Sequence, residues 1–232
     1  MVGKKCYKKG LNMEDVVKES IEIVFSNDKN GVANSENKAS HRYFYKKVFN
    51  TNLKDKMLTF IMLNPSNADQ NKPDQTIKNI EEITIKNKSK GYNGFQIVNL
   101  FSYRTPSQKC LIDKIEKLEN SSINSFNEIN FENYLNTITG DVVLAWGSKA
   151  KSICNKYETK YYNAVLSLLN DKCNKNNINI YTYASSLNKD GSPKHPGAMS
   201  YNRLNDGEKK ELKKLKINKK GENSYVLSLN ES

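Results

Sequence analysis

The sequence predicts an α/β fold, a three-layer sandwich in which helices flank a central, mostly parallel sheet of about four strands. Four short runs are continuously apolar or β-branched, as in strands that are covered on both faces. Amphipathic patterns separate these runs, which favours parallel strands joined by right-handed crossovers. A chain of 232 residues is long enough to bury one such core.

The strand candidates are 58–63, 95–100, 142–146 and 178–183. Between the first two, Ile77, Ile80 and Ile83 recur at helical spacing, and Gly91 provides a stop. The segment 149–170, which follows Gly147, predicts a second amphipathic helix before the last strand. The resulting alternation of strand and helix is the pattern of a parallel sheet.

The flanks of this core predict simpler elements. Residues 21–26 and 41–49 look like a pair of edge strands and form an N-terminal annex. We therefore expect a single domain over 1–203, followed by a basic C-terminal helix and tail over 204–232.

The charge of the chain is strongly positive. Lys and Arg number 37 against 25 Asp and Glu, a formal charge of +12, and such a surplus suits a polyanionic partner. The surplus is nearly all lysine, which AT-rich coding also produces, so charge alone leaves nucleic-acid binding and an incidental surplus both open. The three arginines are more informative because a guanidinium fork matches phosphate and base edges. They are Arg42, Arg104 and Arg203.

Metal, disulfide and membrane signals are weak. The four cysteines are scattered without CxxC spacing, and the chain has two histidines, so we expect no metal site, no disulfide framework and no cofactor. No apolar run approaches the roughly 18–20 residues of a membrane span, and the start "MVGKKCYKKG" lacks a secretion signal. We therefore expect a soluble, cytoplasmic protein.

Polar turns follow the predicted strands. "MLNPSNAD" ends one strand at Asn64-Pro65, where Pro65 keeps Asn64 out of the helical region. "VVLAWGSKA" continues into Gly147-Ser148, and "KDGSPKHPGAMS" holds His195 on a stiff loop. Each segment alone also fits an ordinary turn or cap. Because the carboxyl ends of parallel strands share one edge of a sheet, we expect a single site there.

Taken in order, these segments resemble two families. With "PDQTIKNI" and "GFQIVNLFSYR" they resemble a bacterial and phage family of unknown function, DUF1643, over roughly residues 20–200. More distantly they are similar to the uracil-DNA glycosylase superfamily, through Asn64-Pro65, Asn99, 144–148 and His195-Pro196.

The second resemblance implies a role for each matching residue. Asn64 would position the water that attacks C1′ of the sugar, and His195 would donate a hydrogen bond to the leaving base. Asp69, which belongs to the DUF1643 pattern, is a second candidate for activating the water. The base would be flipped out and held by Asn99, Phe101 and Tyr103. DNA contacts are expected from Ser66, Asn67, Arg104, Ser148, Lys149, Lys194, Pro196 and Arg203.

The chain departs from the glycosylase pattern where the base is read. Ser66 and Gly197 replace the usual Gly and Ser, which indicates a modified pyrimidine as the substrate. The sequence thus predicts a monofunctional DNA glycosylase that leaves an abasic site, in a setting suggestive of defence against phages with hypermodified DNA. A non-catalytic module that senses modified bases and an enzyme on free nucleotides or nucleosides remain alternatives.

Overall fold

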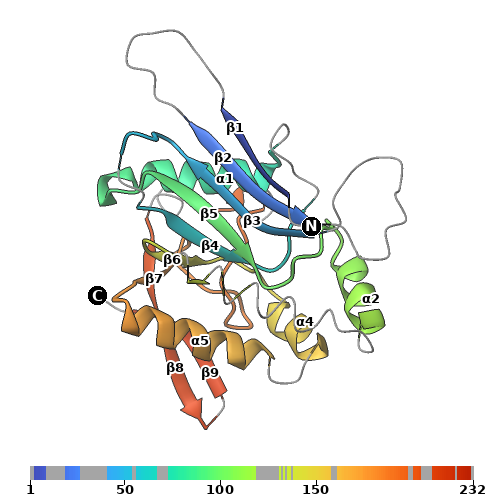
Figure 1. The fold of residues 1–232 in the computed structure, drawn as a ribbon. Helices are drawn as coiled ribbons and strands as arrows, with labels where there is room; N and C mark the ends of the chain where they lie inside the picture. The colour runs from blue at the N-terminus through green and yellow to red at the C-terminus, as the bar shows by residue number, and fades with distance from the viewer. Residues whose placement is uncertain are drawn as a thin grey trace.

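The chain forms a nine-stranded sheet with helices on both faces (Figure 1). The computed structural model describes residues 3–8, 19–26, 41–53, 56–66, 73–118, 131, 133, 135–136, 138–157, 161–197, 201–204, 211–222 and 224–230. The strands are β1 (Gly3–Lys8), β2 (Ser20–Ser26), β3 (His41–Val48), β4 (Leu58–Met62), β5 (Gly94–Asn99), β6 (Val142–Leu144), β7 (Ile180–Thr182), β8 (Lys213–Gly221) and β9 (Ser224–Leu229). The helices are α1 (Gln75–Lys86), the 3-10 helix η1 (Lys88–Lys90), α2 (Gln108–Leu118), α4 (Ala150–Tyr157) and α5 (Tyr161–Lys175).

The centre of the sheet confirms the four predicted strands. They are neighbours in the order β5-β4-β6-β7, and all three pairings between them are parallel. Every residue of β4 and β5 is buried, because helices cover both faces of these strands. The one amide inside β5, Gln96, donates a 2.8 Å hydrogen bond to the hydroxyl of Thr59 on β4, so its polar group is satisfied in the core.

The sheet as a whole differs from the expected one of about four, mostly parallel strands. β1, β2 and β3 extend one side of the parallel centre, and β8 and β9 extend the other, all by antiparallel pairing. The antiparallel pairing predicted for β2 and β3 is confirmed, but neither is an edge strand, because β1 pairs with β2 and β5 pairs with β3. β1 and β8 carry many lysines, which are depleted in strands, so the local pattern of these two segments did not predict them.

Opposite faces of the sheet carry different helices. α1, between β4 and β5, buries Ile77, Ile80 and Ile83 in one hydrophobic cluster. α2, α4 and α5 contribute to the cluster on the other face. This division follows from the strand order. The crossover from β4 to β5 runs in one direction along the sheet, and the connection from β5 to β6 runs in the other. Because crossovers are right-handed, connections in opposite directions lie on opposite faces. β4 and β6 therefore flank the point where the winding direction reverses, and ligands of such sheets bind there.

Of the two predicted helices, one is confirmed and the other is divided in two. The helix that ends before Gly91 is confirmed: Asp74 caps its first turn by accepting a 2.9 Å hydrogen bond from the Ile77 amide, and Gly91 follows η1 with φ of 85°. The single helix expected over 149–170 is two helices, α4 and α5.

The basic helix expected over 204–232 is wrong. Residues from Lys213 to Leu229 form a hairpin of β8 and β9, and β8 pairs with β7 in the main sheet. Leu215 and Ile217 alternate with lysines along β8, and they pack with Tyr225 of β9 on the cluster that α5 contributes to. Packing of this two-residue period against α5 overrides the helical propensity of lysine.

A polar network joins the amino ends of the parallel strands. The hydroxyl of buried Tyr92 donates a 2.5 Å hydrogen bond to Asp141, which also accepts from the backbone and side chain of Asn179. Burial raises the pKa of Asp141, but these hydrogen bonds outweigh burial and the net shift is downward. Lys56 lies 3.9 Å from the same carboxylate. The network fixes the edge of the sheet opposite the carboxyl ends.

Candidate functional site

A cleft lies at the carboxyl ends of β4 and β5, where the first turn of α1 meets the loop that follows β7. Five parts of the chain line it: β3, β4 with its following turn, the start of α1, β5 and the loop after β7. No described helix combines the length and apolarity needed to cross a membrane. The residues that line the cleft are Arg42, Met62, Asn64, Ser66, Asp74, Thr76, Ile77, Ile97 and His195.

Asn64 enters the cleft directly after β4. Its side-chain Nδ2 donates to the backbone oxygen of Thr105 at 2.8 Å, and more weakly to those of Pro65 at 3.2 Å and Tyr103 at 3.4 Å. These bonds fix the orientation of the carboxamide. Among the described residues no donor reaches Oδ1, which leaves that oxygen as an acceptor within the cleft.

His195 faces Asn64 from the loop that follows β7. Its Nδ1 accepts a 2.9 Å hydrogen bond from the Gly197 amide. Burial lowers the pKa of the imidazole to about 4, and the nearby Asp74 carboxylate opposes this shift only in part. The ring is therefore neutral at pH 7, and with Nδ1 an acceptor its proton lies on Nε2. His195 thus supplies a neutral hydrogen-bond donor.

Close packing holds the His195 loop in place. Gly147 has φ of 82°, and a Cβ there would lie 2.9 Å from Cβ of His195. A Cβ on Gly197 would lie 2.9 Å from Nδ1 of the same ring. Buried Asn79 of α1 donates a 2.7 Å hydrogen bond to the backbone oxygen of Pro196. Both glycines are required for the approach of backbone to imidazole, and Asn79 ties the loop to α1.

The first turn of α1 supplies the charged wall of the cleft. Asp74 caps the helix with one carboxylate oxygen and accepts a hydrogen bond from the Ser66 hydroxyl with the other. Arg104 in turn approaches the backbone oxygen of Ser66, with its Nε at 3.5 Å. Ser66 therefore lines the cleft with its hydroxyl engaged in holding the turn, and Arg104 lies beside Ser66, outside the set of cleft residues.

Asn99 ends β5 on the cleft side of the sheet. It follows Ile97, a cleft residue, by two positions, and residues two apart in a strand face the same side. Its side chain is buried with 7% exposure, and neither Oδ1 nor Nδ2 has a hydrogen-bond partner among the described residues. A buried carboxamide without partners costs free energy of order 1–3 kcal/mol per group, so a ligand that binds both atoms would recover it.

Arg42 is a cleft residue that no functional motif of the sequence pointed to. It lies on β3 with 3% exposure and contacts the ring face of Tyr45 at 5.8 Å. Burial and the neighbouring Arg104 guanidinium lower its pKa to about 10, while Asp74 opposes the shift. The sequence feature that could have identified Arg42 is its position inside the largely aromatic run "HRYFY". An arginine is rarely buried among such residues unless it has a specific partner or ligand.

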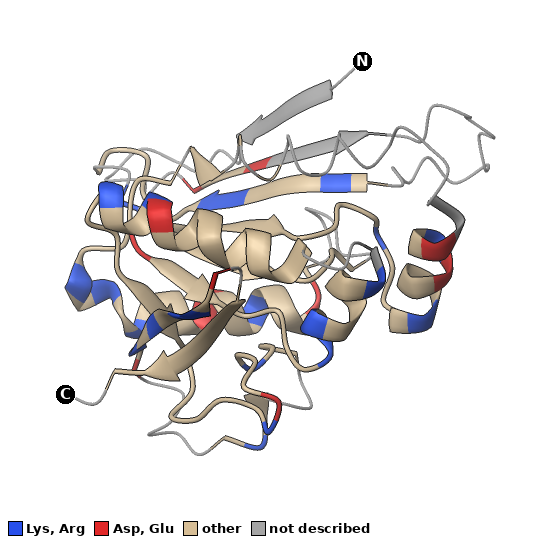
Figure 2. Ribbon diagram, turned by 90° about the horizontal axis from the view of Figure 1, so that it is seen from below, with Lys and Arg blue, Asp and Glu red and all other residues tan. Residues whose placement is uncertain are grey.

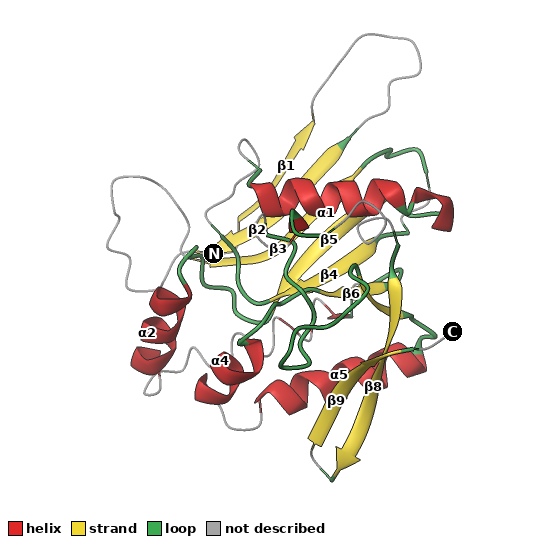
Figure 3. Cartoon of the chain, turned by 180° about the vertical axis from the view of Figure 1, so that it is seen from behind, coloured by secondary structure: helices red, strands yellow, loops and turns green. Residues whose placement is uncertain are grey.

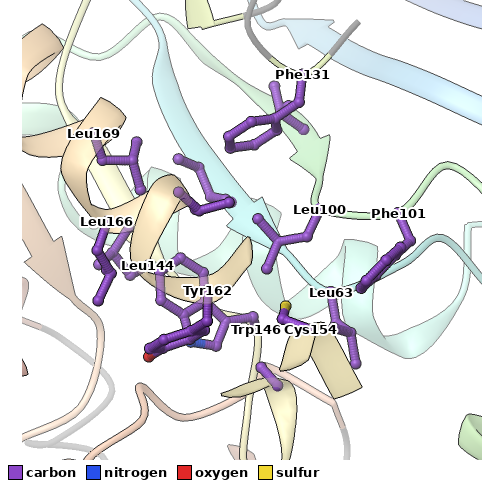
Figure 4. Close-up of a cluster of buried hydrophobic side chains, with 14 of the residues drawn as sticks. Leu63, Leu100, Phe101, Phe131, Leu144, Trp146, Cys154, Tyr162, Leu166 and Leu169 are labelled. Carbon is purple, nitrogen blue, oxygen red and sulfur yellow. The ribbon is translucent and has the colours of Figure 1, made fainter. Parts of the chain in front are cut away.

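Two expected base-binding residues do not line the cleft. Phe101 is buried in the hydrophobic cluster on the opposite face of the sheet (Figure 4). The centroid of its ring lies 5.7 Å from that of Tyr161. Tyr103 contributes its backbone oxygen to Asn64, while its ring lies against His41 and beneath the ammonium of Lys114. Strand alternation would have placed Phe101 on the side of Asn99, but β5 ends at Asn99, so the alternation does not extend to Phe101, which packs on the opposite face.

Of the residues expected to contact DNA, two lie next to His195 and three lie outside the cleft. Pro196 is buried beside His195, and Lys194 is partly buried on the same loop. Ser148, Lys149 and Arg203 are exposed outside the set of cleft residues, and the Lys149 amide is already bonded to Asp190 at 3.2 Å. Asn67 and Asp69 lie outside the described residues.

The cleft offers hydrogen-bonding chemistry. It combines a fixed acceptor on Asn64, a neutral donor on His195 and a buried cation on Arg42. Within the described part of the chain, no three His, Cys, Asp or Glu side chains gather as metal ligands. An arrangement of this kind can orient a water and stabilise negative charge on a leaving group.

The fold and cleft define a mixed α/β protein with a polar site at the carboxyl ends of its parallel strands. The chain belongs to a family described as "Protein of unknown function (DUF1643)", whose family model matches residues 42–197. Comparison with curated proteins and with solved structures gives no match. The matched segment runs from Arg42 to Gly197, so it includes every cleft residue.

Proposed function

We propose that this protein is a DNA glycosylase that hydrolyses the N-glycosidic bond of a flipped-out, modified pyrimidine and leaves an abasic site. One observation carries the proposal: an oriented acceptor, Asn64 Oδ1, and a neutral donor, His195 Nε2–H, line the same cleft. Glycosidic hydrolysis needs both, because water must be directed at the sugar while negative charge grows on the base.

Asn64 would hold the attacking water. Its Nδ2 is committed to backbone oxygens of the 103–105 loop, so Oδ1 is the atom that can accept a hydrogen bond from water. A carboxamide is too weakly basic to deprotonate the water, which suits a reaction in which the sugar already carries positive charge at C1′. Its part is to position the water.

His195 would stabilise the leaving base. A neutral imidazole donates a hydrogen bond to a carbonyl oxygen of the base without first requiring a proton from solvent, and burial keeps it neutral across physiological pH. Removing one such preorganised donor typically lowers the rate by about 10² to 10³.

Asn99 would read the base. A carboxamide presents a donor and an acceptor side by side, as does the edge of a pyrimidine, and this one is buried on the cleft side of the sheet with no partner in the described part of the chain. Reaching a base in this position requires that it leave the duplex. Excision of hypermodified phage bases is the biological role that we propose for this activity.

The decisive experiment is base release. Purified protein is incubated with ordinary, uracil-containing and phage-modified genomic DNA, and released bases are identified by mass spectrometry while abasic sites are detected by alkaline cleavage. We expect release from a DNA with modified pyrimidines, and loss of release in Asn64→Ala and His195→Ala with DNA binding retained. Asn174→Ala, an exposed asparagine of α5, is the matched control and should keep full activity.

Other outcomes would select the alternatives. Salt-sensitive binding to modified DNA without abasic sites would indicate a base-sensing module. Cleavage of free nucleosides that duplex DNA does not inhibit would indicate a nucleotide enzyme. If both cleft variants released bases as fast as the unsubstituted protein, the assignment of the site would be wrong.

A further inference from the structure

The β8–β9 hairpin carries a second feature, separate from the cleft. Five of the nine residues of β8 are lysines and all five are exposed: Lys213, Lys214, Lys216, Lys219 and Lys220. We call this hairpin the lysine ribbon. Neither of its strands contains an acidic residue. Lysines and arginines are also spread over other elements of the described chain (Figure 2), so the ribbon is distinguished by the density of lysines on one strand, with one acid, Glu222, in the turn of the hairpin.

The two faces of the ribbon differ. Leu215, Ile217 and Tyr225 pack on the core beside α5, and the hydroxyl of Tyr225 lies 2.9 Å from that of Ser167. The other face turns away from α5 and is free of large apolar side chains. It presents Lys214, Lys216, Asn218, Val226 and Ser228.

The uncovered face lies on the same side of the sheet as the cleft. Leu212 packs in the cluster that α1 buries, whereas Leu215 packs in the opposite one. Lys214 and Lys216 follow Leu212 at intervals of two residues and so share its side. Figure 3 shows α1 and the hairpin from this side, with α5 behind the hairpin. A polyanion bound here would lie on the side that holds the cleft.

The lysines lie on β8 and not on β9, the last strand of the sheet. Charged residues commonly block pairing at an edge strand. β9, "SYVLSL", has no charge, whereas β8 pairs with β7 at Lys213 and Lys214 and with β9 over the rest of its length. Among the described residues, Lys214, Lys216, Lys219 and Lys220 have no ion pair, while Lys213 pairs with Glu211 at 2.6 Å.

We propose that the lysine ribbon binds the phosphate backbone of double-stranded DNA without regard to sequence. Six residue steps from Lys214 to Lys220 span about 20 Å of strand at roughly 3.3 Å per residue. That length covers about six base-pair steps at the 3.4 Å spacing of phosphates along a strand. Taking DNA as the polyanion rests on the proposed function. A membrane surface fits less well because the uncovered face offers no aromatic or leucine side chain for insertion.

The test compares two variants of equal charge. In the ribbon variant, Gln replaces Lys214, Lys216 and Lys220 together in the full chain. In the control variant, Gln replaces three exposed lysines of α2, α4 and α5, namely Lys109, Lys151 and Lys175. Each set removes three charges, from +12 to +9. Binding to a short unmodified duplex is measured by fluorescence anisotropy between about 50 and 200 mM salt.

The expected result is a change of salt dependence in one variant alone. The slope of log K against log salt is negative, and each lost phosphate contact makes it shallower by about 0.9. The slope of the ribbon variant should therefore be shallower by up to about 2.7, and that of the control almost unchanged. Equal slopes in the two variants would overturn the proposal, as would an unchanged slope with lost binding to anionic phosphatidylserine vesicles. Because the duplex is unmodified, this binding can succeed or fail independently of base release.

Discussion

Replacing Gly147 by Ala should displace His195 from the cleft. Gly147 follows β6 with φ of 82°, a conformation that costs an L-residue roughly 1–2 kcal/mol. The new Cβ would also lie 2.9 Å from Cβ of His195, closer than side-chain carbons approach. The end of a flexible side chain could move aside at little cost. The atom that the new Cβ approaches is instead Cβ of His195, which is bonded to the backbone. Because Asn79 holds this loop through the backbone oxygen of Pro196, the whole loop must shift.

A second glycine separates the two costs. Gly191 has φ of 77°, and a Cβ there would meet nothing within 4 Å. Gly191→Ala should therefore lower the free energy of unfolding by the backbone cost alone, about 1–2 kcal/mol. Gly147→Ala should add an overpacking cost of about 1–3 kcal/mol. Urea denaturation of both variants measures the difference.

The pKa of His195 reports the displacement directly. The chain has two histidines, so the ring signals in an NMR titration are simple to assign. In Gly147→Ala the pKa should rise from about 4 toward its ordinary value of 6.5, because the displaced imidazole gains solvent. In Gly191→Ala it should stay near 4. Equal unfolding free energies in the two variants, with the same low pKa in both, would refute the proposed contact between Gly147 and His195.

Two further predictions concern stability. Because the pKa of His195 is about 4 in the folded chain and 6.5 when unfolded, the unfolded state binds the extra proton between these values. The free energy of unfolding should therefore fall as pH drops from 6.5 to 4, by at most about 1.4 kcal/mol per pH unit from this residue, and a His195→Gln series that kept the same slope would contradict this. Tyr92→Phe should destabilise by about 1–3 kcal/mol in urea, because Asp141 loses a buried donor. Tyr225→Phe, which removes a half-buried hydroxyl, is its control, and an equal loss in both would argue against a special role for the network.

The sequence predicted the parallel centre of the sheet because that information is local. Runs such as "LTFIM" are buried on both faces, so their composition alone marks them as strands. Strand ends follow from the same runs, which is why Asn64, Asn99 and His195 could be assigned to one edge before any contact was known. Of these, Asn64 and His195 line the cleft directly.

Other features depend on contacts between distant segments. The hairpin of β8 and β9 could not be told from a helix, because Leu212 and Leu215 also fit helical spacing and only packing against α5 selects the strand. The face of the sheet on which Phe101 packs depends on the backbone conformation just after β5, because a shift of one residue moves a side chain to the other face. Arg42 entered the cleft through the pairing of β3 with β5.

The sequence by itself determined which residues end the strands, since hydrophobic periodicity is a property of neighbouring positions. Only the tertiary structure decided their chemical state. The neutral imidazole of His195 results from burial, its tautomer from the Gly197 amide, and the orientation of the Asn64 carboxamide from carbonyls some forty residues away in the chain. Solvent exclusion and long-range hydrogen bonds set these properties, and neither is encoded in a short stretch of sequence.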